Sequence, residues 1–140
     1  MDVEVTSGVL ATLHEEAARA MPEECCGILL GAGNTIGQVM PAKNIAAEPC
    51  LRFEIDPAVL LAAHKAARTG GHQVLGYYHS HPRGHPVPSA TDCEHSTGDL
   101  RIWAIIAAGQ VAFFRDSGNG FQPLNFDLVD DRPRDPARYR

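Results

Sequence analysis

The chain places apolar residues at helical spacing in two stretches, and a third, shorter stretch opens with a capping residue. Ser7 is the expected N-cap of the first helix, and Pro22 ends that helix. Asp56 caps the second helix, Pro57 occupies its first turn, and Gly70 follows its end. The pattern therefore predicts helices over residues 7–20, 57–69 and 89–98.

Strand patterns fill most of the remaining chain. The run from Cys25 to Leu30 is short, apolar and bounded by glycines, which is typical of a buried strand, whereas Leu51 to Ile55 alternate as in a half-buried one. The predicted strands cover residues 25–30, 36–41, 51–55, 73–79, 101–107, 110–115 and 121–126. Helices that interrupt an apolar sheet of mixed direction predict an α/β or α+β fold.

Length and charge narrow the class of protein. A chain of 140 residues with 44% hydrophobic residues can form one compact domain with a real core. We expect that domain over residues 1–128, with a mobile, charge-rich tail over 129–140. The net charge of -5 is scattered, which argues against a nucleic-acid or membrane-binding face. The sequence shows neither a secretory signal nor an apolar run of transmembrane length, so the predicted location is the cytoplasm.

The four cysteines are predicted to be structural. None has the CxxC spacing of a zinc knuckle or redox pair, and adjacent cysteines in a strand point to opposite faces. The expected role of Cys25, Cys26, Cys50 and Cys93 is that of small buried hydrophobes in a reducing compartment.

Two histidines end a predicted strand. His79 and His81 are separated by one residue, so both imidazoles point to the same face and can chelate one ion. With seven histidines in the chain, such a pair is weak evidence alone. Ser89 and Asp92 follow in the first turn of the third helix, where they could form a capping box or supply the anionic third ligand that catalytic zinc takes.

A carboxylate stands at the mouth of the first buried strand. Glu24 precedes the run Cys25-Cys26-Gly27-Ile28-Leu29-Leu30-Gly31. It could be a general base for a metal site, or a solvated connector as its neighbour Glu23 is expected to be.

Together these residues resemble the signature of the JAMM/MPN+ zinc metalloproteases. The resemblance rests on Glu24 and the apolar strand after it, His79-Ser80-His81-Pro82, and Ser89 and Asp92 at this spacing. It implies a cytidine-deaminase-like curved mixed sheet flanked by about three helices. It also implies one Zn²⁺ per chain, held by His79, His81 and Asp92, with Glu24 as the general base and Ser89 as the donor to the oxyanion.

The same resemblance implies a substrate. Small stand-alone members of the family resemble prokaryotic enzymes that cleave after the C-terminal Gly-Gly of ubiquitin-like, β-grasp sulfur-carrier proteins, as peptidases or isopeptidases. Two other functions remain open at this stage. One is a module that binds a ubiquitin-like protein without cleaving it. The other is a further zinc hydrolase on this fold, although the Pro-Cys-x-x-Cys motif that nucleobase deaminases carry after a His-x-Glu is absent from the sequence.

Overall fold

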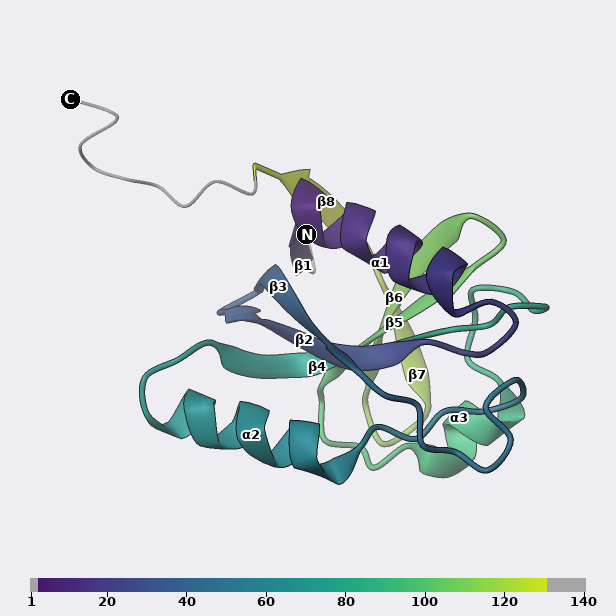
Figure 1. Ribbon diagram of the computed structural model, residues 1–140. Coiled ribbons are helices and arrows are strands. Elements are labelled where there is room, and N and C mark those ends of the chain that lie inside the picture. Colours follow the sequence, from purple (N-terminus) through teal and green to yellow (C-terminus); the bar gives the residue numbers. More distant parts are fainter. Residues whose placement is uncertain (1–2, 131–140) are drawn as a thin grey trace.

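One mixed sheet with helices on both faces forms the protein (Figure 1). The computed structural model describes residues 3–130. The helices are α1 (Ser7–Ala20), α2 (Pro57–Arg68) and α3 (Ala90–His95). The strands are β1 (Val3–Thr6), β2 (Cys26–Ala32), β3 (Thr35–Ala42), β4 (Gln73–Ser80), β5 (Ile102–Ala107), β6 (Gln110–Asp116), β7 (Phe121–Leu124) and β8 (Phe126–Val129).

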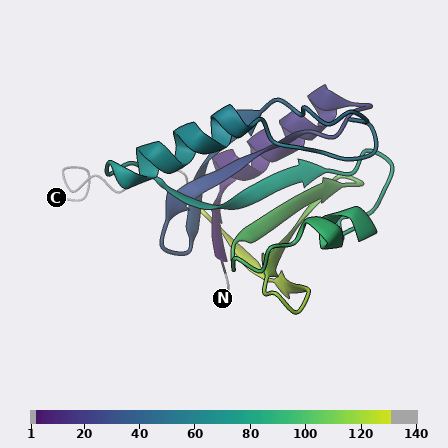
Figure 2. The same cartoon turned by 90° about the horizontal axis from the view of Figure 1, so that it is seen from below.

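The strand order in the sheet is β7-β6-β5-β4-β2-β3-β1-β8. The β4–β5, β1–β3 and β1–β8 pairs are parallel, and the other neighbours are antiparallel. Figures 1 and 2 show the sheet curving between α1 and α2, with α3 at one end. The predicted mixed fold, a curved sheet flanked by three helices, is confirmed.

The core has two parts, one on each face of the sheet. Val9 and Leu13 of α1 pack with buried residues of the sheet in the larger part. On the other face, Ala63 of α2 packs against Ile28 and Leu30 of β2. Because β2 is covered from both sides, it is apolar throughout, as its sequence pattern predicts.

The pairing of β2 with β4 brings distant parts of the chain together. Their antiparallel register places Cys26 opposite His79. Glu24 therefore lies beside the end of β4 at which the two histidines stand. This register is the main way in which the fold positions the candidate site.

The prediction of a strand over 51–55 is wrong. Only Ile55 in that stretch makes a sheet-like bridge, with Asn44. The main-chain N–H groups of Leu51 and Arg52 donate to the Glu48 carbonyl instead, as in a turn. The alternation in the sequence reflects which side chains are more buried. The main-chain hydrogen bonds that a neighbouring strand would otherwise make are made here within local turns.

The predicted last strand, 121–126, is divided in the structure. β7 pairs with β6 at one edge of the sheet, whereas β8 pairs with β1 at the opposite edge. β1 itself was not predicted, because a strand of four residues gives too little alternation. It also supplies the true N-cap of α1, since the Thr6 hydroxyl accepts a hydrogen bond from Val9 N–H at 3.2 Å, which corrects the assignment of Ser7.

Two of the four cysteines are not buried. Cys25 and Cys26 lie in the core as predicted, but Cys50 and Cys93 are exposed. Both lie in connecting or single-turn segments outside the sheet, and composition alone does not reveal this.

The predicted tail lies mostly outside the described residues. Val129 belongs to β8, and residues 131–140 are not described. Among the helices of residues 3–130, none has the length and apolar character needed to cross a bilayer.

Candidate metal centre and active site

The two histidines converge because β4 ends between them. His79 is the next-to-last residue of β4, and His81 follows the strand, so their side chains point the same way. Their Nε2 atoms lie 3.0 Å apart. His79 is completely buried, whereas His81 is partly open to solvent.

Asp92 completes the group from the first turn of α3. Its carboxylate lies 3.1 Å from His79 Nε2 and 3.2 Å from His81 Nε2. The capping box considered as an alternative is also present, because Ser89 N–H donates to Asp92 Oδ2 at 2.9 Å and Asp92 N–H donates to Ser89 Oγ at 3.1 Å. The cap and the three-residue group coexist, and the cap fixes the carboxylate that faces the histidines.

The spacing of this group suits a metal ion. Of the residues that the structure describes, His79, His81 and Asp92 form the cluster able to offer three ligand atoms. Ligands at about 2.0–2.1 Å from a tetrahedral zinc are about 3.3 Å from one another. The observed separations of 3.0 to 3.2 Å are close to that value. Two imidazoles and a carboxylate are also a usual protein ligand set for catalytic zinc.

The tautomer of His81 is compatible with metal binding. Its Nδ1 lies 2.8 Å from the main-chain oxygen of His85. A carbonyl only accepts, so Nδ1 donates, and in the neutral ring Nε2 is left with a free lone pair. That lone pair points toward His79 and Asp92.

His79 is held in an aromatic setting. Its ring stacks on Phe53, with centroids 4.2 Å apart, and meets the edge of Trp103 at 5.7 Å. Burial lowers the pKa of His79, although the neighbouring Asp92 opposes that effect. The ring is therefore neutral at pH 7, which is the form that binds metals.

Asp92 is ionised. Burial alone would raise its pKa, but hydrogen bonds with His79 and His81 outweigh burial and hold the pKa well below its ordinary value. Burial alone would lower the pKa of His81, but hydrogen bonds with Asp92 and the His85 carbonyl raise it, so His81 must release its Nε2 proton when a metal binds. The group then offers two imidazole nitrogens and one anionic oxygen.

Glu24 is placed by main-chain contacts at the start of β2. Its N–H donates to the Pro49 carbonyl at 2.8 Å, and the next N–H, of Cys25, donates to Ser80 Oγ at 2.8 Å. The side chain is buried, with 7% exposure. Burial raises the pKa of Glu24 to about 7; the smaller effect of His81 lowers this pKa, and that of Asp92 raises it. A base whose pKa lies near neutrality is well matched to proton transfer.

Glu24, His81 and Ser89 line one cleft. It has a volume of about 320 Å³ and is bounded by the segments 50–51 and 82–91. Ser89 Oγ accepts from Asp92 N–H, so its own hydroxyl proton remains available to a group in the cleft. The fold thus brings together all five residues that the sequence singled out.

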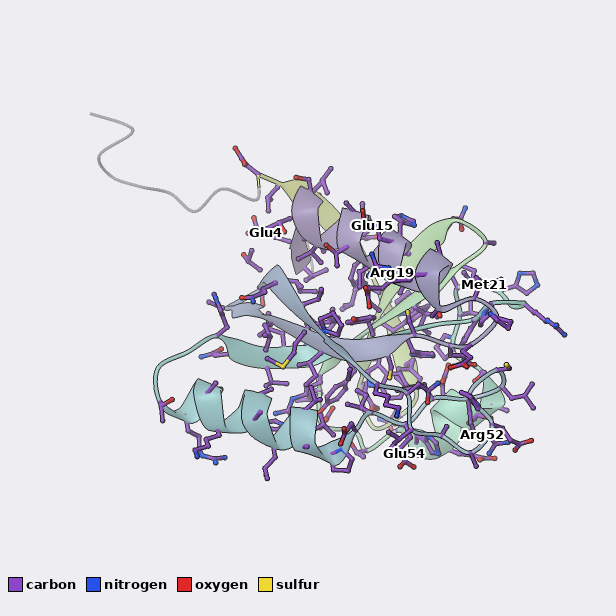
Figure 3. All side chains as sticks on the ribbon, viewed as in Figure 1. Glu4, Glu15, Arg19, Met21, Arg52 and Glu54 are labelled. Atoms are coloured by element: carbon purple, nitrogen blue, oxygen red, sulfur yellow. The ribbon has the colours of Figure 1, made fainter. Side chains whose placement is uncertain are left out.

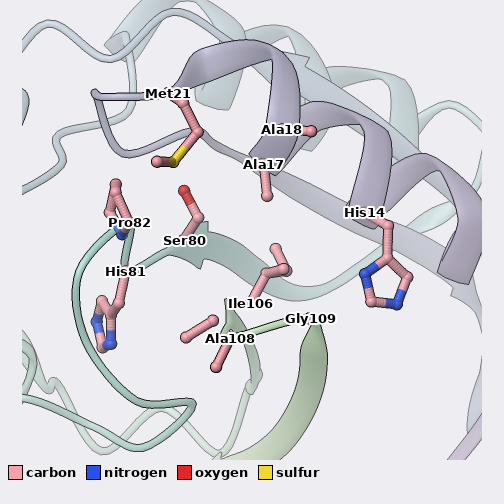
Figure 4. Close-up of a pocket in the computed structure, with 11 residues that line it drawn as sticks. His14, Ala17, Ala18, Met21, Ser80, His81, Pro82, Ile106, Ala108 and Gly109 are labelled. Atoms are coloured by element: carbon pink, nitrogen blue, oxygen red, sulfur yellow. The ribbon is translucent and has the colours of Figure 1, made fainter.

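A second pocket adjoins this cleft at His81 and Pro82. Figure 4 shows it between Met21 and Ala17 of the α1 region and Ala108 of the β5–β6 turn. Its volume is about 210 Å³, and neither Glu24 nor Ser89 lines it. Most of its lining is small and apolar.

The buried thiols are poor nucleophiles. Burial raises the pKa of Cys25 to about 11 and that of Cys26 to about 12. A thiol of that kind carries almost no thiolate at neutral pH, which argues against a nucleophilic cysteine at the start of β2.

Three contributions to the site were not predicted from the sequence. Ser80 anchors the residue after Glu24, Phe53 stacks on His79, and the His85 carbonyl sets the tautomer of His81. The position of Ser80 between the two histidines could have indicated that Ser80 contributes to the site. The other two depend on loop conformations that no sequence pattern specifies.

Comparison with known proteins identifies the family. The fold is that of a JAB/MPN-type domain. Residues 6–117 match the family described as prokaryotic homologs of the JAB domain (Prok-JAB), and the chain belongs to that family. The resemblance found in the sequence is thereby confirmed.

Several relatives carry functional names, among them the following two. Desampylase of Haloferax volcanii is 34% identical over 120 residues, which cover 84% of this chain and 86% of that protein. A probable TtuB-protein conjugate cleaving protease of Thermus thermophilus is 33% identical over 92 residues, 66% of this chain and 62% of that protein. The second alignment spans less than two thirds of the relative's length.

Solved structures share the fold. A protein of Desulfitobacterium hafniense superimposes with a TM-score of 0.80 at 27% identity, covering 91% of this chain and 93% of the other. A JAB1/MPN domain protein of Archaeoglobus fulgidus gives a TM-score of 0.62 at 18% identity, covering 91% and 97%. The latter similarity supports the fold alone.

Proposed function

We propose that this protein is a zinc-dependent peptidase or isopeptidase that cleaves after the C-terminal Gly-Gly of a ubiquitin-like protein. The observation that carries the proposal is the convergence of three metal-type ligands within 3.2 Å of one another, beside a cleft lined by Glu24 and Ser89. Each residue in this group has a distinct part in hydrolysis.

His79, His81 and Asp92 would hold one Zn²⁺ per chain. When bound, zinc lowers the pKa of water to about 7 and polarises a carbonyl oxygen. The remaining steps belong to the chain's own side chains, which place and transfer protons around the scissile bond.

Glu24 is the proposed general base and acid. Its carboxylate accepts a proton from the attacking water and returns it to the leaving amine. A folded-state pKa of about 7 allows both transfers near neutral pH. Ser89 donates its hydroxyl proton to the oxyanion that develops on the attacked carbonyl.

The names of the relatives support the substrate class. One is a desampylase and the other a probable protease of TtuB-protein conjugates. We extend this to a protein conjugated through the C-terminal tail of a small ubiquitin-like partner, and more narrowly to a β-grasp sulfur carrier with a Gly-Gly end. The extended tail would enter along exposed main chain and bring its last carbonyl to the zinc ligands.

We also retain two proposals about the whole chain. Residues 1–128 act as a single catalytic domain, and the enzyme works in the cytoplasm.

The test is cleavage of two matched substrates by the purified protein: a ubiquitin-like carrier fused linearly through Gly-Gly to a short peptide, and the same carrier joined to a lysine side chain. Mass spectrometry locates the scissile bond. Cleavage directly after the second glycine of either substrate supports the proposal. Binding of the carrier without cleavage of either would favour a recognition module instead.

A further inference from the structure

The amide of one residue outside the catalytic group joins several loops. Asn44 follows β3 and is partly buried. Its side chain makes five hydrogen bonds, all to main-chain atoms. Nδ2 donates to the carbonyls of Glu24 (3.0 Å), Arg52 (3.0 Å) and Pro49 (3.4 Å), and Oδ1 accepts from the N–H groups of Ala46 (3.0 Å) and Glu54 (3.1 Å).

These bonds tie the segment 45–54 to the residue that carries the proposed base. Glu24 is fixed on both sides of its peptide unit, because its N–H donates to Pro49 and its carbonyl accepts from Asn44. Pro49 in turn accepts from Asn44 as well. The two loops are thus joined by one direct main-chain hydrogen bond and by the side-chain amide of Asn44.

The tethered segment forms part of the site. Phe53 stacks on His79 with ring centroids 4.2 Å apart, and Cys50 and Leu51 line the cleft beside Glu24. The segment has the alternating pattern of a strand but no ladder in the described chain beyond the Asn44–Ile55 bridge. Asn44 supplies the hydrogen bonds that a neighbouring strand would otherwise provide.

We propose that Asn44 is a positioning residue of the active site, which holds the Glu24 backbone and the 45–54 segment in one arrangement so that the base and Phe53 face the histidines together. This inference rests on the proposed function for its catalytic consequence. Asn44 acts through Glu24 and Phe53, and it does not line the cleft itself.

Two substitutions of Asn44 distinguish the role of the Nδ2 donor from that of the Oδ1 acceptor. Asn44→Ala removes all five bonds. Asn44→Asp keeps an acceptor for Ala46 and Glu54 but places a carboxylate against three carbonyl oxygens, so it loses the link to Glu24. The control is Asn34→Ala, which removes an exposed asparagine side chain from the β2–β3 turn, at the end of β2 remote from Glu24.

The kinetic test compares kcat, KM and metal content. Because a small displacement of a catalytic group is costly, both Asn44 variants should lose roughly ten- to a hundred-fold in kcat, with less change in KM and one metal ion per chain retained. Because part of the effect of Asn44 passes through Glu24, combining Asn44→Ala with Glu24→Gln should cost less than the product of the two single losses. An unchanged kcat, or losses that multiply in the double variant, would overturn the proposal.

A second measurement does not require activity. Amide hydrogen exchange at Glu24, Ala46 and Glu54 should accelerate in Asn44→Ala but not in Asn34→Ala. Trp103 is the single tryptophan of the chain and lies 6.0 Å from Phe53 between ring centroids, so its emission should also shift. Unchanged exchange and emission would refute the tether even if the parent protein cleaves no substrate, which separates this inference from the proposed function. If Asn44→Ala does not fold, Asn44→Asp provides the same comparison.

Discussion

Adjacent carboxylates at the start of β2 have different surroundings. Glu24 is 7% exposed and faces the cleft, whereas Glu23 is exposed. Burial raises the pKa of Glu24 to about 7, so its carboxylate can exchange protons near neutral pH. The difference arises from the loop that packs on Glu24, and this is why the local sequence alone favoured a solvated connector over a general base.

Substituting Glu24 and its neighbour Glu23 in turn tests the role of the base. Glu24→Gln should reduce kcat by roughly 10²- to 10⁴-fold, because a proton acceptor is lost, and it should leave the metal content unchanged because Glu24 is not a ligand. Glu23→Gln should retain activity within about two-fold. Steady-state kinetics and elemental analysis on both variants give the answer, and loss of metal in Glu24→Gln would reassign Glu24 to the ligand set.

The raised pKa of Glu24 also predicts a pH dependence of stability. The folded protein binds the proton more tightly than the unfolded chain, so this contribution is complete below about pH 4.5 and is lost as the pH rises through about 7. Relative to the parent, metal-free Glu24→Gln should therefore gain about 3 kcal/mol in free energy of unfolding between pH 4.5 and pH 8. Urea unfolding of chelator-treated proteins measures it. A difference that does not change with pH would contradict the assigned burial.

Ser89 has a catalytic and a structural role that substitution can separate. Ser89→Ala and Ser89→Gly both remove the hydroxyl and should lose roughly 10²-fold in kcat. Glycine is a much better N-cap than alanine, so only Ser89→Ala should also destabilise the protein, by about 1 kcal/mol. Kinetics and thermal unfolding of the two variants test this. If Ser89→Gly kept the activity of the parent and only Ser89→Ala lost it, the hydroxyl would matter only as a helix cap.

At the scale of elements, close strand contacts fix the site. Gly76 of β4 lies opposite Ile102 of β5, and a Cβ at this glycine would approach the Ile102 carbonyl oxygen to 1.7 Å. His79 follows Gly76 on the same strand, and His81 comes directly after the strand ends. Any shift of β4 relative to its neighbours therefore moves the metal ligands.

Gly76→Ala should consequently destabilise the fold by about 3 kcal/mol or more and weaken metal binding. Gly37→Ala in β3 is the control, since nothing lies within 4 Å of its added Cβ. Thermal unfolding with and without zinc compares the two. Equal melting temperatures would show that the strands separate more easily than the structure indicates.

The accuracy of the sequence-based prediction differed between elements. The long helices were found because burial of one face imposes a period on them, as in α1, and the central strands because burial on both faces makes them apolar runs, as in β2. Residues 51–55 show a strand period without a partner strand, and β1 and β8 pair across nearly the whole chain length. Such pairing depends on topology, which local alternation does not contain. The candidate site residues were found because their types and spacing resemble those of a known family.

Over the whole molecule, the site lies where several connecting segments meet. The end of α1, the loop before α2 and the start of α3 lie toward one end, as the positions of Met21 and Arg52 in Figure 3 indicate. The sheet supplies His79 rigidly, and the loops supply Glu24, Ser89 and the cleft walls. A bound metal would crosslink β4 to α3 and should therefore raise the melting temperature in proportion to the logarithm of free metal.

The most direct test of the central claim is elemental analysis of the purified protein, with His81→Ala, Asp92→Ala and the surface variant Asp99→Ala beside it. One zinc per chain in the parent and in Asp99→Ala, with loss of zinc in both site variants, is the predicted result. Tight zinc retained by Asp92→Ala, or no zinc in the parent after refolding with the metal, would contradict the assignment of this group as a metal centre.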